Sequence, residues 1–476
     1  MARKTDPFPV RQRGAALLLM MLVLMVAATA VLVSRLSTTE LRALRLETTQ
    51  DALAAARRAI IDHAAVQPDL AFGDPVTLPC PDIDDSLGLD EGEAHTNGCG
   101  TAGETVMGRV PWKTLGIEPP RDSSAACLWY VVSGAWKAAG SETSSLINPD
   151  SNGQLELWSV DSGSLLEGTT PDRRPVALLI APMDAVPGQA RPAATGRQCS
   201  PNFAAANFLD ADGGTGISNA SLTGAADVVD ALAVVAGRSE THNDRIATIS
   251  RADLADAITE RPDFETTMRG LGLAVAECVA DYARHNSGGV DDQRMPWPAP
   301  LALADYRPDT AYDDADSGTY SGRLPDVIDD SNAQTGNTTS GLLTACDSGA
   351  VVQWSAGMQN LWSHWKDHFF YVVAESHAPT AGVPSACTNC LTVNGAGQYA
   401  AVVLFAHPRL SALSQRRDAP PLDVDTRDAI GNYLEGANAF GFPYAGGGLD
   451  LVSQATSNTF NDRLYCIDAA LAVSEC

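Results

Sequence analysis

The sequence predicts an α+β protein in which one long N-terminal helix precedes two duplicated domains, each a helix packed on a small antiparallel sheet. Three observations support this prediction. An uncharged apolar segment, residues 15–33, continues into helix-favouring sequence without Gly or Pro up to residue 65. The rest of the chain holds short runs of aromatic and β-branched residues, such as FFYVV at 369–373, which are typical of strands. The segments that follow the long helix also recur once, in the same order.

Length and charge limit the classes of function. The chain of 476 residues is long enough for two or three domains with cores of their own. It holds 58 acidic against 32 basic residues, a formal net charge of −26. Proteins that bind nucleic acid usually present a basic face to the phosphate backbone. The composition therefore argues against nucleic-acid binding.

The N-terminal segment combines a basic flank with an apolar run. Residues 1–14 carry four basic residues and one acid. The 19 uncharged residues that follow would span about 28 Å as a helix, close to the thickness of a bilayer core. We interpret residues 15–34 as a transmembrane helix half and residues 35–66 as an amphipathic half. The positive-inside rule then predicts a single-pass inner-membrane protein with its C-terminal bulk in the periplasm.

Three alternatives compete for this segment: an uncleaved anchor, a cleaved secretory signal and a leader cut before the helix. Ala28-Thr29-Ala30 is an A-x-A pattern that a signal peptidase could use. Helix-favouring sequence continues beyond Ala30 without a break, however, so a cut there would divide one predicted helix. This continuity favours either the anchor or the early cut.

The start of the apolar run resembles a known family. Arg13-Gly14, the small residue Ala15, the apolar stretch and the long helix are similar to the type IV pilin and type II secretion pseudopilin superfamily. The resemblance covers residues 11–65 and implies that a prepilin peptidase cuts between Gly14 and Ala15 and methylates the new N-terminus. Residues 1–14 are then a prepilin-type leader. The implied partners are that peptidase, the inner membrane and other pilin or pseudopilin subunits.

Leu19 departs from the family pattern. The fifth residue after the proposed cut is usually a glutamate, which in the family meets the amine of a neighbouring subunit during assembly, and tip-type subunits lack it. Leu19 therefore implies a minor, tip-located subunit, exported at a fibre tip, that acts in fibre assembly and contact and is not an enzyme. The alternative function is a permanently membrane-anchored periplasmic or surface binding protein without processing.

The sequence after the long helix predicts two copies of one unit. These are a first pilin-like globular domain at 67–262 and a second, duplicated one at 263–476. Ordered matches at offsets between 214 and 241 support the duplication, and a charged stretch near 259–264 marks the boundary. The main matches are Leu78-Pro79-Cys80-Pro81 with Met295-Pro296-Trp297-Pro298, Gly108-Arg109 with Gly322-Arg323, Tyr130-Val131-Val132 with Tyr371-Val372-Val373, Gln189-Ala190-Arg191 with Gln415-Arg416-Arg417, Asn207-Phe208-Leu209-Asp210 with Asn432-Tyr433-Leu434-Glu435, and Asn243-Asp244-Arg245 with Asn461-Asp462-Arg463.

The ten cysteines predict disulfides formed in an oxidising compartment, because their number is even and they show no zinc-site pattern. We predict a bond between Cys80 and Cys99, which would close the acidic connection after the helix; bonds from Cys80 to Cys127 and from Cys99 to Cys199 are the rival pairings. Cys387 and Cys390 have redox-motif spacing, but their flanks favour a structural staple. The disulfide candidates are Cys80, Cys99, Cys127, Cys199, Cys278, Cys346, Cys387, Cys390, Cys466 and Cys476.

Candidate metal ligands lie between the first two cysteines. Asp82, Asp84 and Asp85 offer the oxygens that calcium prefers, but EF-hand spacing is absent, and a solvated acidic loop is the alternative. His364 and His368 stand four apart without the glutamate of a zinc protease, so we interpret them as ordinary amphipathic surface. We therefore predict no catalytic residues and no cofactor other than this calcium candidate.

Overall fold

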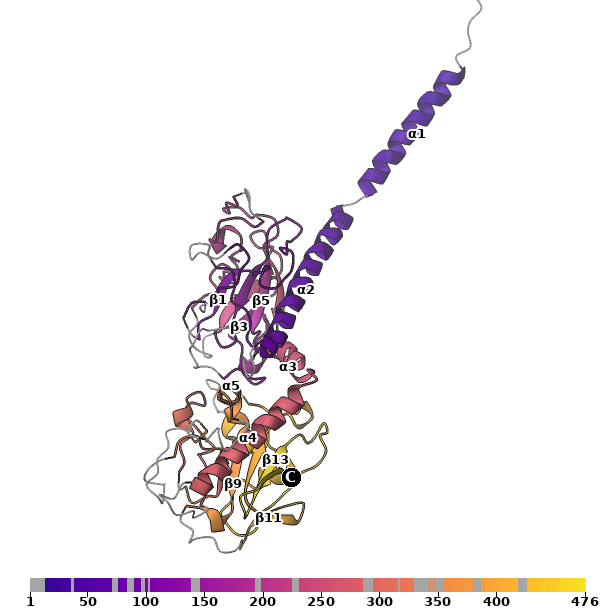
Figure 1. The fold of residues 1–476 in the computed structure, drawn as a ribbon. Helices are drawn as coiled ribbons and strands as arrows, with labels where there is room; N and C mark the ends of the chain where they lie inside the picture. Colours follow the sequence, from indigo (N-terminus) through magenta and orange to yellow (C-terminus); the bar gives the residue numbers. More distant parts are fainter. Residues whose placement is uncertain are drawn as a thin grey trace, which may run out of the picture.

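The computed structural model has a mixed α+β fold with several antiparallel sheets, which agrees with the predicted fold class at that level (Figure 1). An elongated N-terminal helical segment leads into two compact regions that lie one after the other along the molecule. The structure describes residues 13–35, 38–70, 76–83, 90–95, 99–101, 103–137, 146–192, 198–224, 231–285, 294–315, 317–328, 342–343, 346, 354–379, 387, 389–417 and 426–476.

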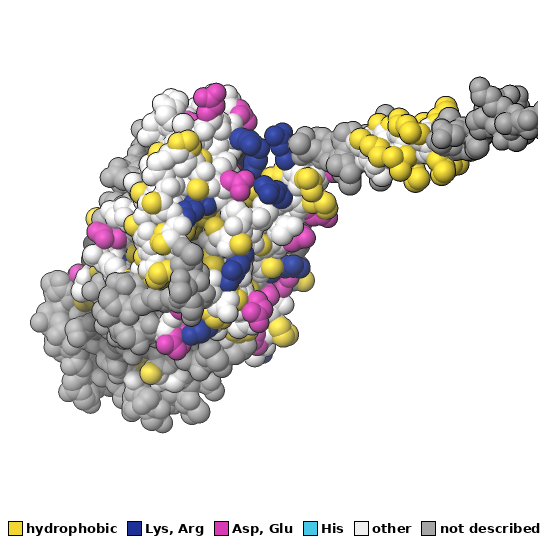
Figure 2. Space-filling model, turned by 90° about the horizontal axis from the view of Figure 1, so that it is seen from above, with side chains coloured by type: hydrophobic (Ala, Val, Ile, Leu, Met, Phe, Trp, Pro, Cys, Tyr) yellow, Lys and Arg dark blue, Asp and Glu magenta, His cyan; other side chains and the backbone are white. Residues whose placement is uncertain are grey.

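The N-terminal helical segment differs from the prediction. Instead of one unbroken helix, the structure has α1 (Arg13–Arg35) and α2 (Thr38–Leu70), with residues 36–37 outside the described part of the chain. The described side chains of α1, at residues 17–31, are exposed and mostly large and apolar (Figure 2). Helix α1 projects away from both regions, whereas α2 lies along the first of them (Figure 1).

The predicted single-pass inner-membrane location is wrong. Among the helices built by the described residues, none has the length and apolarity that crossing a membrane requires. The apolar side chains that the structure describes in α1 run only from residue 17 to residue 31. An α-helix needs about 20 apolar residues to cross the hydrocarbon core.

The N-terminal region is built on a four-stranded antiparallel sheet of order β1-β2-β5-β7. Its strands are β1 (Val106–Arg109), β2 (Trp129–Val132), β5 (Ala177–Ala181) and β7 (Arg245–Ile249). Helix α2 packs on β5 and β7, and α3 (Arg251–Thr259) packs beside α2. A small second sheet has the order β4-β3-β6, formed by β3 (Leu155–Ser159), β4 (Leu165–Glu167) and β6 (Leu232–Ala236).

The C-terminal region repeats this plan with a larger sheet. Helix α4 (Phe264–His285) packs on the strands β11, β13 and β14 of a sheet in which β8, β9, β11 and β13 follow one another as antiparallel neighbours. Its strands are β8 (Ser321–Arg323), β9 (Phe369–Val373), β10 (Leu391–Val393), β11 (Ala396–Phe405), β12 (Asp450–Leu451), β13 (Arg463–Asp468) and β14 (Val473–Glu475). The other helices are α5 (Ala356–Trp365) and α6 (Gly436–Phe440).

Short 3₁₀ helices connect many of these elements. They are η1 (Pro171–Arg173), η2 (Ala205–Asn207), η3 (Asp309–Ala311), η4 (Lys366–His368), η5 (Glu375–His377), η6 (Ser411–Leu413), η7 (Thr426–Asp428) and η8 (Ile430–Asn432).

Segments that match in the sequence occupy equivalent positions in the two regions. Gly108 and Arg109 end β1, and Gly322 and Arg323 end β8. The main chain of Arg109 exchanges two hydrogen bonds with Asp82, and that of Arg323 exchanges two with Ala299. Each arginine is buried over an equivalent aromatic pair. Arg109 lies over Trp129 and Phe208, and Arg323 lies over Phe370 and Tyr433.

One apolar core joins the two regions. It contains residues of α2 and α3, such as Leu53 and Ile258, together with Leu271 of α4 and Phe369 of β9. Alternate residues of each sheet face this core, while those between them, such as Val131 and Val372, belong to a second cluster on the other face of the sheet. Because both faces of both sheets are buried, their central strands are almost continuously apolar.

Candidate functional site

The residues proposed for processing and assembly lie in α1. Gly14 and Ala15 are the second and third residues of this helix, and Leu19 is 66% exposed. The described side chains around Leu19 are also exposed and apolar, so this part of α1 presents an uncovered apolar surface.

The acidic loop is only partly described. Asp82 is buried, and its Oδ2 accepts a hydrogen bond from the backbone N–H of Gly92 at 2.8 Å. Asp84 and Asp85 lie outside the described residues. Asp82 therefore holds a turn of the backbone.

All ten cysteines are joined in disulfides, as predicted, and Cys80 is bonded to Cys99. The rival pairings of these two cysteines are excluded, because Cys127 pairs with Cys199. In the second region, Trp297 stands in the place of Cys80 and packs against Tyr320 with ring centroids 5.6 Å apart. The remaining bonds are Cys278–Cys346, Cys387–Cys390 and Cys466–Cys476.

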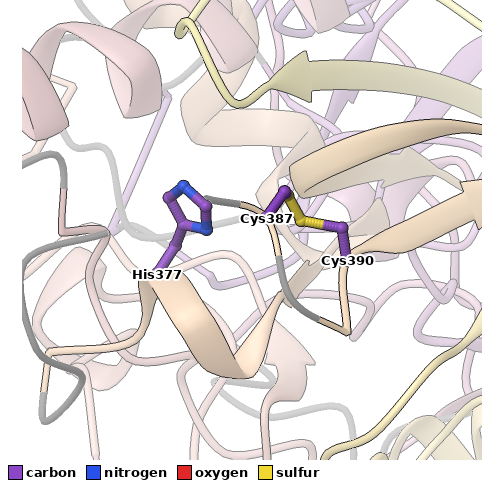
Figure 3. Close-up of side chains that lie close together, drawn as sticks. All are labelled: His377, Cys387 and Cys390. Carbon is purple, nitrogen blue, oxygen red and sulfur yellow. A yellow bond between two sulfur atoms is a disulfide. The ribbon is translucent and has the colours of Figure 1, made fainter. Parts of the chain in front are cut away.

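His377 lies beside the disulfide of Cys387 and Cys390, which the sequence did not indicate (Figure 3). The imidazole is buried, and its Nδ1 lies 3.0 Å from the hydroxyl of Ser376. Burial lowers the pKa of His377, which favours the neutral ring. While the two sulfurs are bonded to each other they are not thiolates, and thiolates are what a metal ion would need. The arrangement fits the predicted structural staple.

Two equivalent polar clusters are the most elaborate arrangement of side chains in the described part of the chain. We define the N-terminal acid cluster as Gln189, Asp210, Asn219 and Asp244, and the C-terminal acid cluster as Gln415, Glu435, Asn438 and Asp462. Each cluster contains two buried carboxyl groups. Each lies where the loop before β7 or β13 meets the loops that follow β5 or β11.

The two clusters share a set of equivalent hydrogen bonds. The Gln189 amide donates to Asp210, and the Gln415 amide donates to Glu435, both at 2.8 Å. The backbone N–H of Asp210 donates to Asp244 at 2.9 Å, and that of Glu435 donates to Asp462 at 3.0 Å.

The asparagines also correspond. Asn219 donates to Asp244 and Asn438 donates to Asp462, both at 2.9 Å. Each asparagine also exchanges two hydrogen bonds with one backbone residue, Val235 or Val452. The amide donors of the glutamine and the asparagine therefore have counterparts in the other cluster.

Each cluster holds a carboxyl group that resists ionisation. Burial and then the charge of Asp210 raise the pKa of Asp244 well above its usual range. Burial and then the charge of Glu435 do the same for the pKa of Asp462. Two carboxyl groups that face each other in a buried site oppose each other's ionisation.

A histidine distinguishes the N-terminal acid cluster. His242 is fully buried, and its Nε2 lies 4.0 Å from Oδ2 of Asp244. The equivalent residue of the second region is Phe460, which precedes Asn461 as His242 precedes Asn243. The N-terminal cluster therefore has a nitrogen ligand that its counterpart lacks.

The two regions meet at a buried group of charges around Asp150. Its carboxylate lies 2.9 Å from Nη1 of Arg417, 2.8 Å from Nε of Arg409 and 3.1 Å from Nε2 of His368. Burial alone would raise the pKa of Asp150, but Arg417, His368 and Arg409 hold it well below its usual value of 3.8. This junction is a buried ion cluster made by one acid of the first region and three basic side chains of the second.

His364 and His368 belong to the same junction, so their interpretation as amphipathic surface is wrong. They are 8% and 0% exposed. The backbone N–H of Ile147 donates to Nδ1 of His364 at 3.3 Å. Nδ1 of His368 lies 2.6 Å from the Ala406 carbonyl, which can only accept a hydrogen bond, so that this nitrogen carries a proton.

A cavity of about 340 Å³ lies between η3 and α5 in the C-terminal region. Asp326 on its wall is buried, and burial is the main cause that raises its pKa to about 6. Lys366, on the same wall, bonds to Asp309. Charged side chains thus line this cavity, but they are already paired with one another or with the backbone.

Sequence reasoning found most members of the acid clusters without recognising their role. Gln189, Asp210 and Asp244 were markers of the repeat rather than site residues. Asn219 and Asn438 were missed, although each is followed by alanine and their spacing falls within the range of the other matches. A search of the repeat for matched polar residues would have found them.

Comparisons with known proteins identify no relative. No protein-family model matches the chain, and neither does any curated protein or any solved structure.

Proposed function

We propose that this chain is a minor, pilin-like structural subunit of a type IV pilus or a type II secretion pseudopilus, which acts in fibre assembly and contact. The observation that carries the proposal is the exposed apolar helix α1. It stands apart from the two regions, and its continuation α2 packs on an antiparallel sheet (Figure 1).

The exposed apolar surface of α1 would be buried if other apolar helices packed against it. Large apolar side chains from Leu17 to Val26, and Val31 beyond them, are at least 54% exposed. Exposed apolar area of this extent is costly in water and marks an interaction surface. Apolar helices of other pilin or pseudopilin subunits would cover it in a helical bundle, with the acidic regions facing solvent.

The leader supports the same assignment. Gly14 and Ala15 lie at the beginning of α1, where a helix has unpaired backbone N–H groups and opens easily. A prepilin peptidase needs an extended backbone without a side chain before the bond it cuts, and Gly14 meets that need.

Leu19 supports a minor and tip-located place in the fibre. A bulk subunit would need a carboxylate at this position to meet the amine of its neighbour, and Leu19 has none. The size of the two regions also favours the tip, because a chain of this bulk would be hard to repeat along a thin fibre. We therefore expect a copy number far below that of the major subunit, and similar copy numbers along purified fibres would contradict the tip location.

The test is to express the full chain with a prepilin peptidase and to determine the N-terminus and mass of the product. We expect a chain that begins at methylated Ala15. Gly14→Ala should leave the leader in place, because the added methyl group blocks the extended backbone from the peptidase site.

Ala30→Leu is the matched control, because it removes the only A-x-A pattern of the apolar segment and leaves Gly14 intact. It should be processed normally. Processing of Gly14→Ala at the wild-type rate, or a mature chain that begins at Val31, would overturn the proposal.

A further inference from the structure

Three side chains that can bind a metal ion converge in the N-terminal acid cluster. One ligand atom from each of Asp210, His242 and Asp244 lies within 4.8 Å of the other two. The three residues are 1%, 0% and 0% exposed. A zinc ion at about 2.0–2.2 Å from each donor atom would bring these atoms to about 3.5 Å from one another. Side-chain movements of about 1 Å would therefore complete the site.

The cluster leaves ligand atoms without full hydrogen bonding. Oδ1 of Asp244 has no hydrogen-bond partner among the described residues, while Oδ2 accepts from Asn219 and from the backbone of Asp210. A buried carboxylate oxygen without a donor is costly unless a proton or a cation faces it. This atom is the first sign that the cluster is built for a positive ligand.

Nε2 of His242 is the second sign. The Asn219 amide nitrogen lies 3.1 Å from it, but that amide has only two hydrogens. Asn219 directs them to the carbonyl of Val235 and to Asp244, both at 2.9 Å. In the other cluster, Asn438 donates its two amide hydrogens to the equivalent acceptors, the carbonyl of Val452 and Asp462. Nε2 therefore receives no hydrogen from Asn219, and it lies 4.0 Å from Oδ2 of Asp244.

The second region shows that the fold does not need this histidine. Phe460 takes its place there, is 3% exposed, and the C-terminal acid cluster keeps the same hydrogen bonds around Glu435 and Asp462. An apolar side chain thus satisfies the packing at this position. A buried histidine that packing does not require, placed beside two carboxyl groups, points to a ligand.

The charges and donor atoms select the class of ion. Two carboxylates and one imidazole are typical ligands of zinc, manganese and iron, whereas calcium prefers six or more oxygens. A divalent ion would balance the negative charges of the two carboxylates. Arg191 lies close enough to Asp210 and Asp244 to offset part of their charge, so the ion competes with this guanidinium as well.

We propose that Asp210, His242 and Asp244 form a binding site for a divalent first-row transition-metal ion, which ties the loop before β7 to the loop after β5 in the N-terminal region. The C-terminal region holds the equivalent loops with hydrogen bonds alone. This site is independent of the proposed role in a fibre.

The test uses the full chain in detergent, with its disulfides intact. The protein is unfolded in denaturant with a chelator and refolded with Zn²⁺, or with Mn²⁺ in a parallel sample, because a buried site loads as the chain folds. Free metal is removed, and elemental analysis measures the ion bound per chain. We expect one ion per wild-type chain and a higher melting temperature than that of the metal-free protein.

His242→Phe copies the residue that the second region uses, so it should fold and yet lose the ion, with an affinity at least about 100-fold lower. His63→Phe is the matched control, the same substitution on α2 away from the cluster, and it should still bind one ion. Phe460→His should bind a second ion per chain.

Circular dichroism establishes that each variant is folded, and His242→Leu replaces His242→Phe if the latter does not refold. Two results would overturn the proposal: a refolded wild-type chain that binds neither ion, or a folded His242 variant that binds as much metal as the wild type.

Discussion

The two regions share a sheet order and a buried acid cluster, yet they direct one equivalent arginine differently. Arg191 remains within its own region, where it donates to the backbone carbonyls of Asn207 and Phe208. Arg417 makes the equivalent bond to the carbonyl of Asn432 and then extends Nη1 to Asp150 of the first region. The matched residues of the repeat thus hold each region together. The regions differ where one of them contacts the other.

The same separation applies to two other matched positions. His242 stands beside the N-terminal cluster, and Phe460 fills the equivalent place in the other region. Cys80 is bonded to Cys99, whereas Trp297 packs against Tyr320. At each of these positions a covalent bond or a polar side chain in one region is matched by an apolar contact in the other. The backbone tolerates either, because the hydrogen bonds that both regions share already hold it.

The largest effect should come from the junction that only the C-terminal arginine makes. Asp150→Asn removes the carboxylate that pairs with Arg417, Arg409 and His368. Breaking a buried ion cluster by removing one partner leaves the others uncompensated, so the free energy of unfolding should fall by about 4 kcal/mol in urea denaturation.

Acid should weaken this contribution. The pKa of Asp150 is held below 3.8 in the folded state, so its stabilising effect is present above that pH and is lost as the pH falls through the folded pKa. The wild-type advantage over Asp150→Asn should therefore narrow in strong acid. Asp184→Asn is the control, since its ion pair with Arg45 is largely exposed and should contribute less than about 1 kcal/mol. Equal losses for both variants would show that the junction is not a structural link.

A matched pair of glycines tests whether the two sheets are equivalent in energy as well as in shape. A Cβ at Gly108 would lie 2.3 Å from the carbonyl oxygen of Asp82, and one at Gly322 would lie 2.1 Å from that of Ala299. Both contacts involve backbone that is already paired with the following arginine. Each alanine substitution should therefore lower the free energy of unfolding by about 3 kcal/mol.

Gly431→Ala is the control for these variants, because nothing lies within 4 Å of its Cβ position and its backbone is compatible with alanine. We expect its stability to change little or to rise slightly. Chemical denaturation of the three variants gives the comparison. A large loss for Gly108→Ala beside none for Gly322→Ala would mean that the second sheet can move its β8 edge, and the equivalence would fail there.

The repeat could be recognised in the sequence because the residues that mark it cannot be replaced without disturbing the fold. Gly108 and Gly322 allow close backbone approach, and Arg109 and Arg323 lie over equivalent aromatic pairs. Such residues recur at fixed spacing and are visible without a structure. The α+β class, the strands and the Cys80–Cys99 bond followed from local pattern and loop closure in the same way.

Contacts between the regions could not be predicted, since nothing in the repeat indicates which residues cross from one copy to the other. Asp150 has no matched partner in the second copy, and His364 and His368 looked like surface because helical spacing does not show what covers a helix. The predicted membrane span was read from hydropathy alone and is not supported by the described helices. His242 gave no signal either, because its counterpart is a phenylalanine.

The smallest effect should be a pH dependence caused by Asp326, a buried carboxyl group of the C-terminal region. The matched segments Gly108-Arg109-Val110-Pro111 and Gly322-Arg323-Leu324-Pro325 are followed by Trp112 in one region and by Asp326 in the other. Burial, and to a lesser degree the charge of Asp309, raises the pKa of Asp326 from 3.8 to about 6, against the opposing effects of the Leu343 N–H and of Lys366. The folded protein therefore binds the proton of this carboxyl group more tightly than the unfolded chain does.

The sign of the resulting pH effect follows from linkage. The stability that the protonated carboxyl group contributes is fully present below pH 3.8 and is lost as the pH rises through about 6. Between pH 4 and pH 7 this loss amounts to about 2 kcal/mol.

Asp326→Asn keeps an oxygen that can accept a hydrogen bond from the Leu343 backbone N–H, at 3.2 Å in the wild type, but its side chain cannot ionise. Urea denaturation of both proteins at several pH values gives their free energies of unfolding. That of the variant should rise relative to that of the wild type by about 2 kcal/mol between pH 4 and pH 7, because the other acids titrate alike in both proteins. Parallel stability curves would mean that Asp326 ionises as freely in the folded protein as in water, and the contrast with Trp112 would then be one of packing alone.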